Sequence, residues 1–355
     1  MKSEILRLLK ESDDYISGQQ MCDRFHVSRT AVWKAIEQLK KEGYEIEAVR
    51  NRGYRLLESP DIMSEAEIRS LMDTEWAGKN IVYFDEIDST NNRAKELGEK
   101  DGAHGTLFVA DRQVAGKGRR GRVWESPKGI SIYMTILLRP DLIPTKAPML
   151  TLVMAQSVAE GIREVTGMET GIKWPNDIVM NKKKVCGILT EMSTEIDYIN
   201  YVVIGVGINV NQKVFDEELK EKATSLMIET GAPVKRSALI AAVMKHFEIN
   251  YALFMENGDL SGLQESYNEM LVNRGKEVRI LEPGNEYNAH AYGINETGEL
   301  IVRTQKGEEK HIFAGEVSVR GIYGYVSSQD ISLCDVRSLT GFCLVLHGLE
   351  IIKKE

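Results

Sequence analysis

A stretch rich in glycine and arginine carries the clearest chemical signal in this 355-residue sequence. Residues 115–124 read AGKGRRGRVW, with three glycines among the six residues that begin at Gly116. Glycine lets a backbone bend and approach a ligand closely, and arginine binds phosphate oxygens in a bidentate manner. Between Arg112 and Lys128 there are six cations and one acid, Glu125. The stretch predicts a mobile loop that folds over the phosphates of a nucleotide. The alternatives are a solvated basic loop or a nucleic-acid contact.

Two further segments have the composition of strand ends beside a ligand. Residues 173–177 read KWPND and precede the lysine run 182–184 and the apolar stretch VCGIL, so a Lys or Asp there can point into a cleft. Residues 204–211 read IGVGINVN, and two glycines inside an apolar strand usually mean that a ligand or another backbone comes close. The alternatives are a polar hairpin for the first segment and tight sheet packing for the second.

Neither glycine-rich segment is a standard nucleotide fingerprint. The loop at 115–124 lacks the GxxxxGK[ST] spacing, and Val210 stands where a GxGxxG motif needs its third glycine. A fourth segment, DSTNN at residues 88–92, follows the apolar run IVYFDEI. It predicts a strand-to-helix turn, and simple capping by Ser or Thr is the alternative to a ligand contact.

In this order, the four segments resemble those of the bacterial biotin–protein ligases of the repressor type. The resemblance covers about residues 1–325 and includes DSTN, the stretch from Gln113 to Trp124, KWPND, KKVCGIL, GVGIN and the closing GEVSVR at 315–320. The chain departs from the family at Lys117, where the loop usually has an arginine, so charge is kept but bidentate geometry is lost. Residues 327–355 have no counterpart in the family, and this tail is left unassigned.

The resemblance implies roles for particular side chains. Lys184 and Arg119 are the expected catalytic residues, with Lys184 near the reacting carboxyl and the α-phosphate. The residues expected to bind biotin are Ser89, Thr90, Asn91, Gln113, Lys117, Gly118, Arg119 and Lys184. The residues expected on the nucleotide or metal side are Arg122, Asn176, Asp177 and Asn209. The residues expected to give the ligand room are Gly187, Gly205 and Gly207.

The implied reaction has two steps. The biotin carboxylate attacks the α-phosphate of ATP to give biotinoyl-5′-AMP and pyrophosphate, and a lysine of the biotin carboxyl carrier protein then attacks the mixed anhydride. Biotin and ATP are the expected substrates, with Mg²⁺ accompanying ATP. The alternatives are a ligase of a related carboxylate such as lipoate, and a metabolite-sensing repressor without turnover.

No metal site built from protein side chains is expected. The four cysteines have neither metal-ligand nor redox spacing, which also argues against a disulfide framework. They are Cys22, Cys186, Cys334 and Cys343.

A separate unit, residues 1–57, is predicted at the N-terminus. Apolar residues at helical spacing near 5–9, Ser17 before GQQMCDRF and Ser28 before RTAVWKAIEQLKKEG predict three helices. YEIEAV and GYRLLE around a basic tip predict a hairpin. This order is typical of a winged helix-turn-helix that binds operator DNA, with protein contacts as the alternative. The expected DNA contacts are Ser28, Arg29, Thr30, Trp33, Lys34, Arg50 and Arg52.

The rest of the chain is predicted to form two further domains in a multidomain α+β fold. Ser59-Pro60-Asp61 predicts a linker. Residues 64–271 mix β-rich runs with helices at Pro148–Thr166 and Lys235–Glu256, which predicts a catalytic α/β domain on a mixed sheet; the resemblance implies a class II synthetase-like one. In residues 273–326, short alternating strands, of which 309–320 is the last, predict a small antiparallel β-barrel.

Composition limits the class of protein. The net charge of −8 argues against a protein that coats nucleic acid non-specifically, although residues 1–60 carry 11 basic and 10 acidic side chains. The N-terminus does not resemble a signal peptide, and the apolar stretch Leu150–Ala159 is too short to span a membrane. We therefore expect a cytoplasmic protein without membrane contact. Because repressors usually bind two half-sites, we also expect a homodimer promoted by biotinoyl-AMP.

Overall fold

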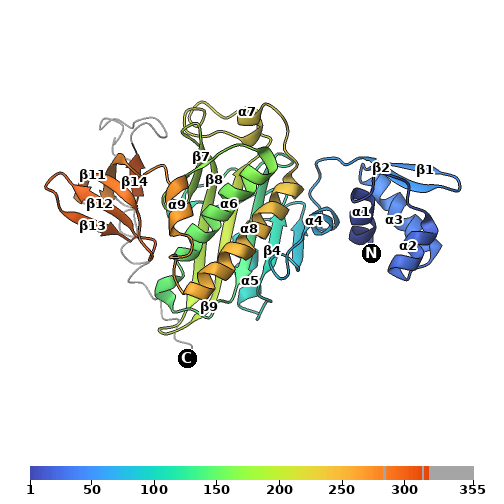
Figure 1. Cartoon of the computed structure of the whole chain (residues 1–355), viewed down its shortest axis with the longest axis horizontal. Coiled ribbons are helices and arrows are strands. Elements are labelled where there is room, and N and C mark those ends of the chain that lie inside the picture. The colour runs from blue at the N-terminus through green and yellow to red at the C-terminus, as the bar shows by residue number, and fades with distance from the viewer. Residues whose placement is uncertain (283–284, 314–315, 320–355) are drawn as a thin grey trace.

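The structure is a computed structural model in which three groups of elements follow one another along the long axis (Figure 1). It describes residues 1–282, 285–313 and 316–319. The tail at 327–355, with Cys334 and Cys343, lies outside the described residues, as do the two ends of the GEVSVR motif.

The N-terminal group has the predicted order of helix, helix, turn, helix and hairpin. Ser17 and Gln20 form a capping box at the second helix, and the Ser28 side chain accepts a hydrogen bond from the Ala31 N–H at the third. Gly53 has a φ of +116°, and a Cβ there would lie 2.1 Å from the Ile16 carbonyl oxygen, so only glycine fits. The elements are α1 (Lys2–Lys10), α2 (Gly18–Phe25), α3 (Arg29–Lys41), β1 (Glu45–Val49) and β2 (Gly53–Glu58).

The central group is built on a mixed sheet, as the sequence predicts, and this sheet has seven strands among the described residues. The strand order is β3-β4-β5-β9-β8-β7-β6. Only the β3–β4 pairing is parallel among the described strands of this sheet. The strands are β3 (Ile81–Phe84), β4 (Thr106–Ala110), β5 (Ser131–Leu138), β6 (Gly171–Lys173), β7 (Asp177–Met180), β8 (Lys183–Thr194) and β9 (Ile199–Asn209).

Helices cover both faces of this sheet. The long helices α6 (Met149–Thr166) and α8 (Arg236–Asn257) lie side by side over one face (Figure 1). Even-numbered residues of β5, such as Met134, belong to the core beneath them. Leu137 points the other way and packs with α5 (Thr90–Gly98) on the opposite face. Both sides of β5 are therefore buried, which explains its continuous apolar run.

The helix α8 is long and apolar enough to meet the length and composition test for a membrane span, the one such helix in the described ranges. It packs against α6 and the sheet, and Val243, Phe247 and Phe254 are fully buried. It is therefore a core helix. The apolar stretch Leu150–Ala159, too short to span a membrane, belongs to its neighbour α6.

Several short elements were not predicted, because each is too short to show a period of its own. Besides β6, these are α4 (Glu65–Leu71), α7 (Leu226–Thr230), α9 (Gln264–Met270) and the 3₁₀ turns at Arg119–Gly121 and Pro144–Lys146.

The C-terminal group is an antiparallel sheet in the order β13-β12-β11-β10-β14. The prediction of a single strand over 309–320 is wrong: β13 pairs with β12, whereas β14 pairs with β10 at the opposite edge. No pairing within the described residues joins these two edge strands, so the described sheet is open. The strands are β10 (Lys276–Glu282), β11 (Asn285–Ile294), β12 (Leu300–Thr304), β13 (Glu309–Ile312) and β14 (Glu316–Val319).

Candidate active site

A row of glycines forms a floor on two neighbouring strands of the central sheet, β8 and β9. Tyr133 of β5 pairs with Gly207 of β9, which in turn pairs with Gly187 of β8. Gly205 precedes Gly207 by two residues on β9, so the two glycines share one face of the sheet, and Gly205 pairs with Leu189 of β8. The register thus brings together three glycines that are distant or non-adjacent in sequence, and the backbone itself becomes the surface at this point.

Side chains from two other segments, and Lys184 of β8 itself, lie over this floor. A Cβ on Gly205 would stand 2.1 Å from the amide oxygen of Asn91, and one on Gly207 would stand 2.6 Å from the indole ring of Trp124. A Cβ on Gly187 would meet the Lys184 ammonium at 3.0 Å. The glycines are therefore required by the side chains that pack over them, not merely by close packing of the sheet.

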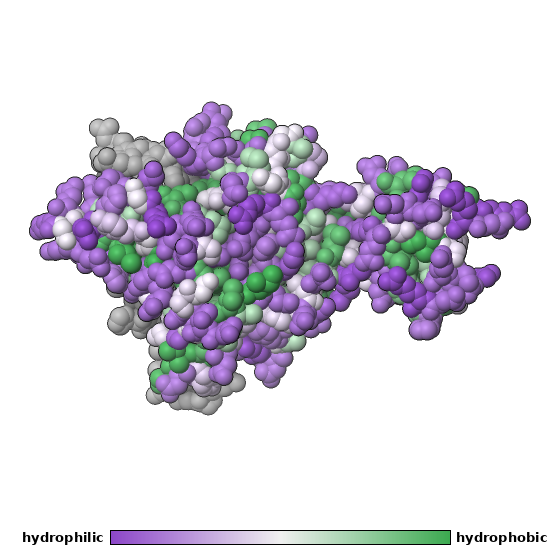
Figure 2. Space-filling view, viewed as in Figure 1, coloured by the Kyte–Doolittle hydropathy of each residue, from purple (hydrophilic) through white to green (hydrophobic). Residues whose placement is uncertain are grey.

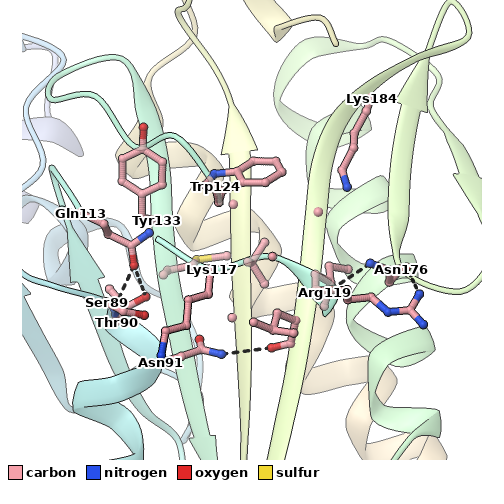
Figure 3. Close-up of a pocket in the computed structure, with 18 residues that line it drawn as sticks. Ser89, Thr90, Asn91, Gln113, Lys117, Arg119, Trp124, Tyr133, Asn176 and Lys184 are labelled. Atoms are coloured by element: carbon pink, nitrogen blue, oxygen red, sulfur yellow. Dashed lines mark hydrogen bonds between the residues drawn. The ribbon is translucent and has the colours of Figure 1, made fainter. Parts of the chain in front are cut away.

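These side chains line one pocket (Figure 3). All eight residues that the sequence analysis expected to bind biotin are among those lining it, as is Asn176. The remaining lining residues are Trp124, Tyr133, Met134, Gly187, Ile188, Leu189, Gly205, Val206 and Gly207. Four segments that lie up to about a hundred residues apart in the chain thus converge on a single site.

The start of α5 forms one side of the pocket. The Thr90 N–H and hydroxyl both donate to the Gln113 side-chain oxygen, at 2.9 and 3.1 Å. The Thr135 hydroxyl donates to the Asn91 side-chain oxygen at 2.6 Å. Ser89 is the N-cap of α5 but makes no capping hydrogen bond within the described structure. Capping therefore does not explain the serine in DSTN, and its buried hydroxyl faces the pocket instead.

A half-buried ion pair supports Asn91 from behind. The Asn91 amide donates to the Glu191 carboxylate at 2.8 Å, and Lys95 of α5 is 2.7 Å from the same carboxylate. Burial alone would raise the pKa of Glu191, but the hydrogen bonds from Lys95 and Asn91 outweigh it and lower that pKa. Glu191 therefore stays ionised and holds the amide in one orientation.

The glycine–arginine loop spans the pocket. The Gly118 N–H donates to the Arg122 carbonyl at 2.7 Å, and the Trp124 N–H donates to the Gly116 carbonyl at 3.0 Å, so the loop closes on itself. Its side chains reach both walls: the Arg119 guanidinium donates to the Asn176 side-chain oxygen at 2.7 Å. On the other side, Lys117 donates to Asn92 at 3.1 Å.

Lys184 reaches the pocket because β7 and β8 are out of regular register. The pairing shifts between Ile178 and Val179, so one extra residue of β8 lies opposite β7. Such a bulge re-aims side chains, and Lys184 extends over Gly187. Its ammonium lies 2.6 Å from the Asp177 carboxylate and 5.4 Å from the centre of the Trp124 ring.

Three residues expected on the nucleotide side do not line the pocket. Asp177 is next to it, beside Lys184. Arg122 is exposed on the outer part of the loop. Asn209 is buried, and its amide donates to the Thr224 carbonyl at 3.1 Å. Within the described residues, no group of three or more His, Cys, Asp or Glu side chains is placed to hold a metal ion.

Two aromatic lining residues were not among the expected site residues. Trp124 ends the loop motif, and its indole covers Gly207. Tyr133 lies on β5, on the face opposite α6 and α8, and its hydroxyl donates to the Pro127 carbonyl at 3.0 Å. In a strand with one exposed face, alternation of apolar and polar residues would show which side chains share a face. Both faces of β5 are buried, so this signal is hidden in residues 131–138.

The residues expected to bind DNA are exposed on the N-terminal group. Those of the third helix occupy its N-terminal half, and the Trp33 side chain is 53% exposed. Arg50 and Arg52 are at the end of the β1–β2 hairpin, a hydrophilic projection at the extreme right of Figure 2. The Arg52 guanidinium stacks 4.1 Å from the centre of the Tyr15 ring. The positively charged tip is thus held on an aromatic platform.

Three parts of the chain match known families. Residues 2–55 match the HTH domain, residues 83–209 the Biotin/lipoate A/B protein ligase family, and residues 275–320 the Biotin protein ligase C terminal domain. The pocket-lining segments all lie within the second match.

Similar chains and structures agree with these matches. The Bifunctional ligase/repressor BirA of Bacillus spizizenii is 43% identical over 324 residues, which cover 90% of this chain and 98% of that one. Its namesake from Escherichia coli is 28% identical, with 88% and 95% covered. A biotin protein ligase from Aquifex aeolicus, solved in complex with biotin and ATP, has a TM-score of 0.60 and 34% identity, and covers 68% of this chain and 99% of that one. The chain belongs to the biotin protein ligase family, in its bifunctional ligase/repressor group.

Proposed function

We propose that the pocket joins biotin to AMP and then transfers biotin to a lysine of the biotin carboxyl carrier protein. The observation that carries this proposal is the convergence of the DSTN turn, the glycine–arginine loop, Lys184 and the glycine row on one pocket. Uncharged hydrogen-bonding groups lie at the α5 side together with the Lys117 ammonium, which contacts Asn92, whereas Arg119 and Lys184 lie at the side of Asn176 and β8 (Figure 3). This division suits a ligand with a neutral polar head and a carboxylate that meets a phosphate.

In the first step, catalysis comes from positioning and from charge stabilisation. Thr90, Asn91 and Gln113 orient biotin, while Lys184 and Arg119 stabilise negative charge that develops on the α-phosphate. Asp177 and Asn176 hold these two cations in place through their contacts at 2.6 and 2.7 Å. Magnesium enters with ATP as part of the substrate, since the described side chains offer it no cluster of ligands.

In the second step, the loop protects the adenylate. The Trp124 ring and the loop backbone form the outer wall of the pocket, so they exclude water from the mixed anhydride until the acceptor lysine arrives. Lys117 stands where the family loop usually has arginine, and it contributes charge through a single contact to Asn92.

The N-terminal group, residues 1–57, is the DNA-binding domain of a biotin-responsive repressor in the cytoplasm. Exposed side chains at the start of α3 and at the hairpin tip suit contacts to bases and phosphates. We propose that operator DNA is bound by a homodimer. Biotinoyl-AMP promotes this homodimer because it orders the loop in advance, so less entropy is lost on assembly.

We propose that residues 64–271 are the catalytic domain with a class II synthetase-like sheet, and that the described strands of the predicted domain 273–326, β10 to β14, close into a small barrel. The short connection between β13 and β14 supports closure. From Ile312 to Glu316 there are four residue steps, which span at most about 14 Å. Yet β13 and β14, at opposite edges of a flat five-stranded sheet, would lie about 19 Å apart. This difference supports a curved sheet whose two edges approach each other.

The direct test is transfer of labelled biotin to a purified acceptor domain in the presence of Mg²⁺ and ATP, with labelled lipoate in a parallel reaction. We expect transfer of biotin to one acceptor lysine, and none without ATP. Efficient transfer of lipoate, or no transfer of biotin, would contradict the proposal.

A further inference from the structure

The DNA-binding unit meets the catalytic domain without a flexible connection. Ile62 packs against the core of the N-terminal group, whereas the next residue, Met63, is 4% exposed and belongs to the core of the central sheet. The carboxylate of Asp61 accepts hydrogen bonds from the Arg236 N–H and guanidinium, both at 2.9 Å. The segment predicted as a linker is therefore anchored to both sides.

The short helix α4 lies directly after this segment, between α1 and α8 (Figure 1). Arg7 of α1 caps its C-terminal end: the guanidinium donates to the carbonyls of Arg69, Ser70 and Met72 at 2.9, 3.1 and 2.6 Å. The last carbonyls of a helix lack partners within the helix and attract cations. One side chain of the DNA-binding unit thus completes a helix of the catalytic domain.

A buried carboxylate on the same helix accepts hydrogen bonds from side chains of both domains. Glu67 is 1% exposed. It accepts hydrogen bonds from Lys10 at 2.6 Å and from the Tyr44 hydroxyl, both in the DNA-binding unit. It also accepts one from the Ser237 hydroxyl of α8 at 3.1 Å. A buried charge is unfavourable unless it is fully paired, so any orientation that separates these groups is disfavoured.

We propose that Arg7 and Glu67 form a rigid joint that determines which spacing between operator half-sites the dimer accepts. The inference rests on the proposed operator binding. In a symmetric dimer, the dimer contact and the angle at this joint together fix the distance between the two copies of α3. A joint with directional contacts at both ends of α4 holds one angle, and hence one spacing. Arg7 and Glu67 are positioning residues and touch no DNA.

The test uses the full chain with biotin and ATP, and duplexes that carry two inverted half-sites. The centre-to-centre distance changes by single base pairs over about one helical turn of roughly 10 base pairs. We expect the wild type to prefer one spacing by at least about tenfold, because a displaced second half-site loses its contacts. In Glu67→Gln and Arg7→Met the preference should fall to within about threefold, while binding to a single half-site and biotin transfer remain unchanged.

Lys2→Met is the matched control. This substitution removes an ion pair of α1 with the same 2.6 Å length as the pair between Lys10 and Glu67. The partner of Lys2, Glu42, lies within the DNA-binding unit, so the joint is not touched. This variant should keep the wild-type spacing preference. Glu67→Asp keeps the charge and should restore part of the preference that Glu67→Gln loses. If Glu67→Gln does not fold, the half-buried Arg7 still provides the test.

The outcomes separate the joint from the function on which it rests. A wild-type chain that binds no operator refutes the proposed DNA binding. A wild type that binds all spacings equally, or variants as selective as the wild type, overturns the joint but leaves DNA binding intact.

Discussion

At the scale of single residues, the account depends on where Lys184 points. The lysine lies on a strand in which simple alternation would place it on the other face from Gly187, three residues later. The bulge opposite Ile178 and Val179 reverses this, so the ammonium reaches the pocket. The Asp177 carboxylate at 2.6 Å keeps the ammonium in place without blocking its other N–H groups.

Replacement of this lysine tests its role. Lys184→Ala should slow formation of biotinoyl-AMP by about 10²- to 10³-fold, the usual effect of losing one group that stabilises developing charge. Pyrophosphate release in a single turnover measures this step. Lys183→Ala is the control, since Lys183 is directed away to the Lys220 carbonyl. Near wild-type pyrophosphate release by Lys184→Ala would remove the lysine from the mechanism.

The sequence identifies many of the residues that line the pocket but not their arrangement. The segments around Ser89, Gln113 and Lys184 could be identified because their residue types are unusual for plain strands and turns. The coverage of Gly205 by Asn91 could not, because it depends on pairing between strands about seventy residues apart. Likewise, nothing local to Lys184 reveals the bulge, which arises between two strands.

At the scale of elements, the loop from Gln113 to Trp124 is anchored on both walls of the pocket. Arg119 holds the wall that contains Asn176, and Lys117 holds the wall that contains Asn92. These two contacts attach the loop to the walls of the pocket. Because the loop has few apolar contacts of its own, we expect them to determine how long it stays over the pocket.

Arg119→Gly should therefore release biotinoyl-AMP faster, by about tenfold or more, the equivalent of one charge-assisted hydrogen bond. Free adenylate would then label bystander lysines, and mass spectrometry of an added unrelated protein measures that labelling. Arg112→Ala, which removes an exposed pair with Glu86, should not change it. Equal retention of adenylate by Arg119→Gly and the wild type would show that the contact of Arg119 with Asn176 does not hold the adenylate in the pocket.

The helix pair α6 and α8 contains a group that links stability to pH. His246 of α8 lies between Glu160 and Glu164 of α6, and hydrogen bonds to Glu160 and Glu164 raise its pKa despite partial burial. A raised folded-state pKa contributes stability that is fully present below the ordinary histidine pKa of about 6.5, and that is lost as pH rises through the folded pKa.

The stability difference between the wild type and His246→Gln should therefore be largest near about pH 6 and should shrink at alkaline pH. Chemical denaturation at several pH values measures this difference. A difference that is constant with pH would mean that His246 is neutral throughout and only packs between the helices.

The elements with their own local signals are the ones the sequence predicts correctly. Ser17 and Ser28 mark the starts of α2 and α3, and both caps are present. By contrast, α4 has seven residues, and its importance comes from Arg7 and Lys10, about sixty residues earlier. The split of 309–320 into β13 and β14 is equally non-local, because each half pairs with a different edge of the sheet.

At the scale of the whole molecule, the anchored seam places the DNA-binding unit in a defined relation to the pocket. Arg236 joins the two regions: its guanidinium contacts Asp61 at the seam and, at 2.7 Å, Asp111 at the end of β4. Asp111 is two residues from Gln113, which lines the pocket. A series of contacts therefore connects the DNA-binding unit to the segment beside the pocket, and under the proposed function we expect the ligand in the pocket to affect DNA binding.

Operator binding by the full chain, measured before and after addition of unbiotinylated acceptor domain, tests this link between the two activities most directly. With biotin and ATP present, the account predicts tight binding as a dimer to two inverted half-sites. Binding should weaken once the acceptor discharges the adenylate. In Lys184→Ala, biotin and ATP should not strengthen operator binding, and the acceptor should not weaken it. Operator affinity that is the same with and without biotin and ATP, and unaffected by the acceptor, would contradict the account and leave a ligase whose DNA-binding domain acts independently.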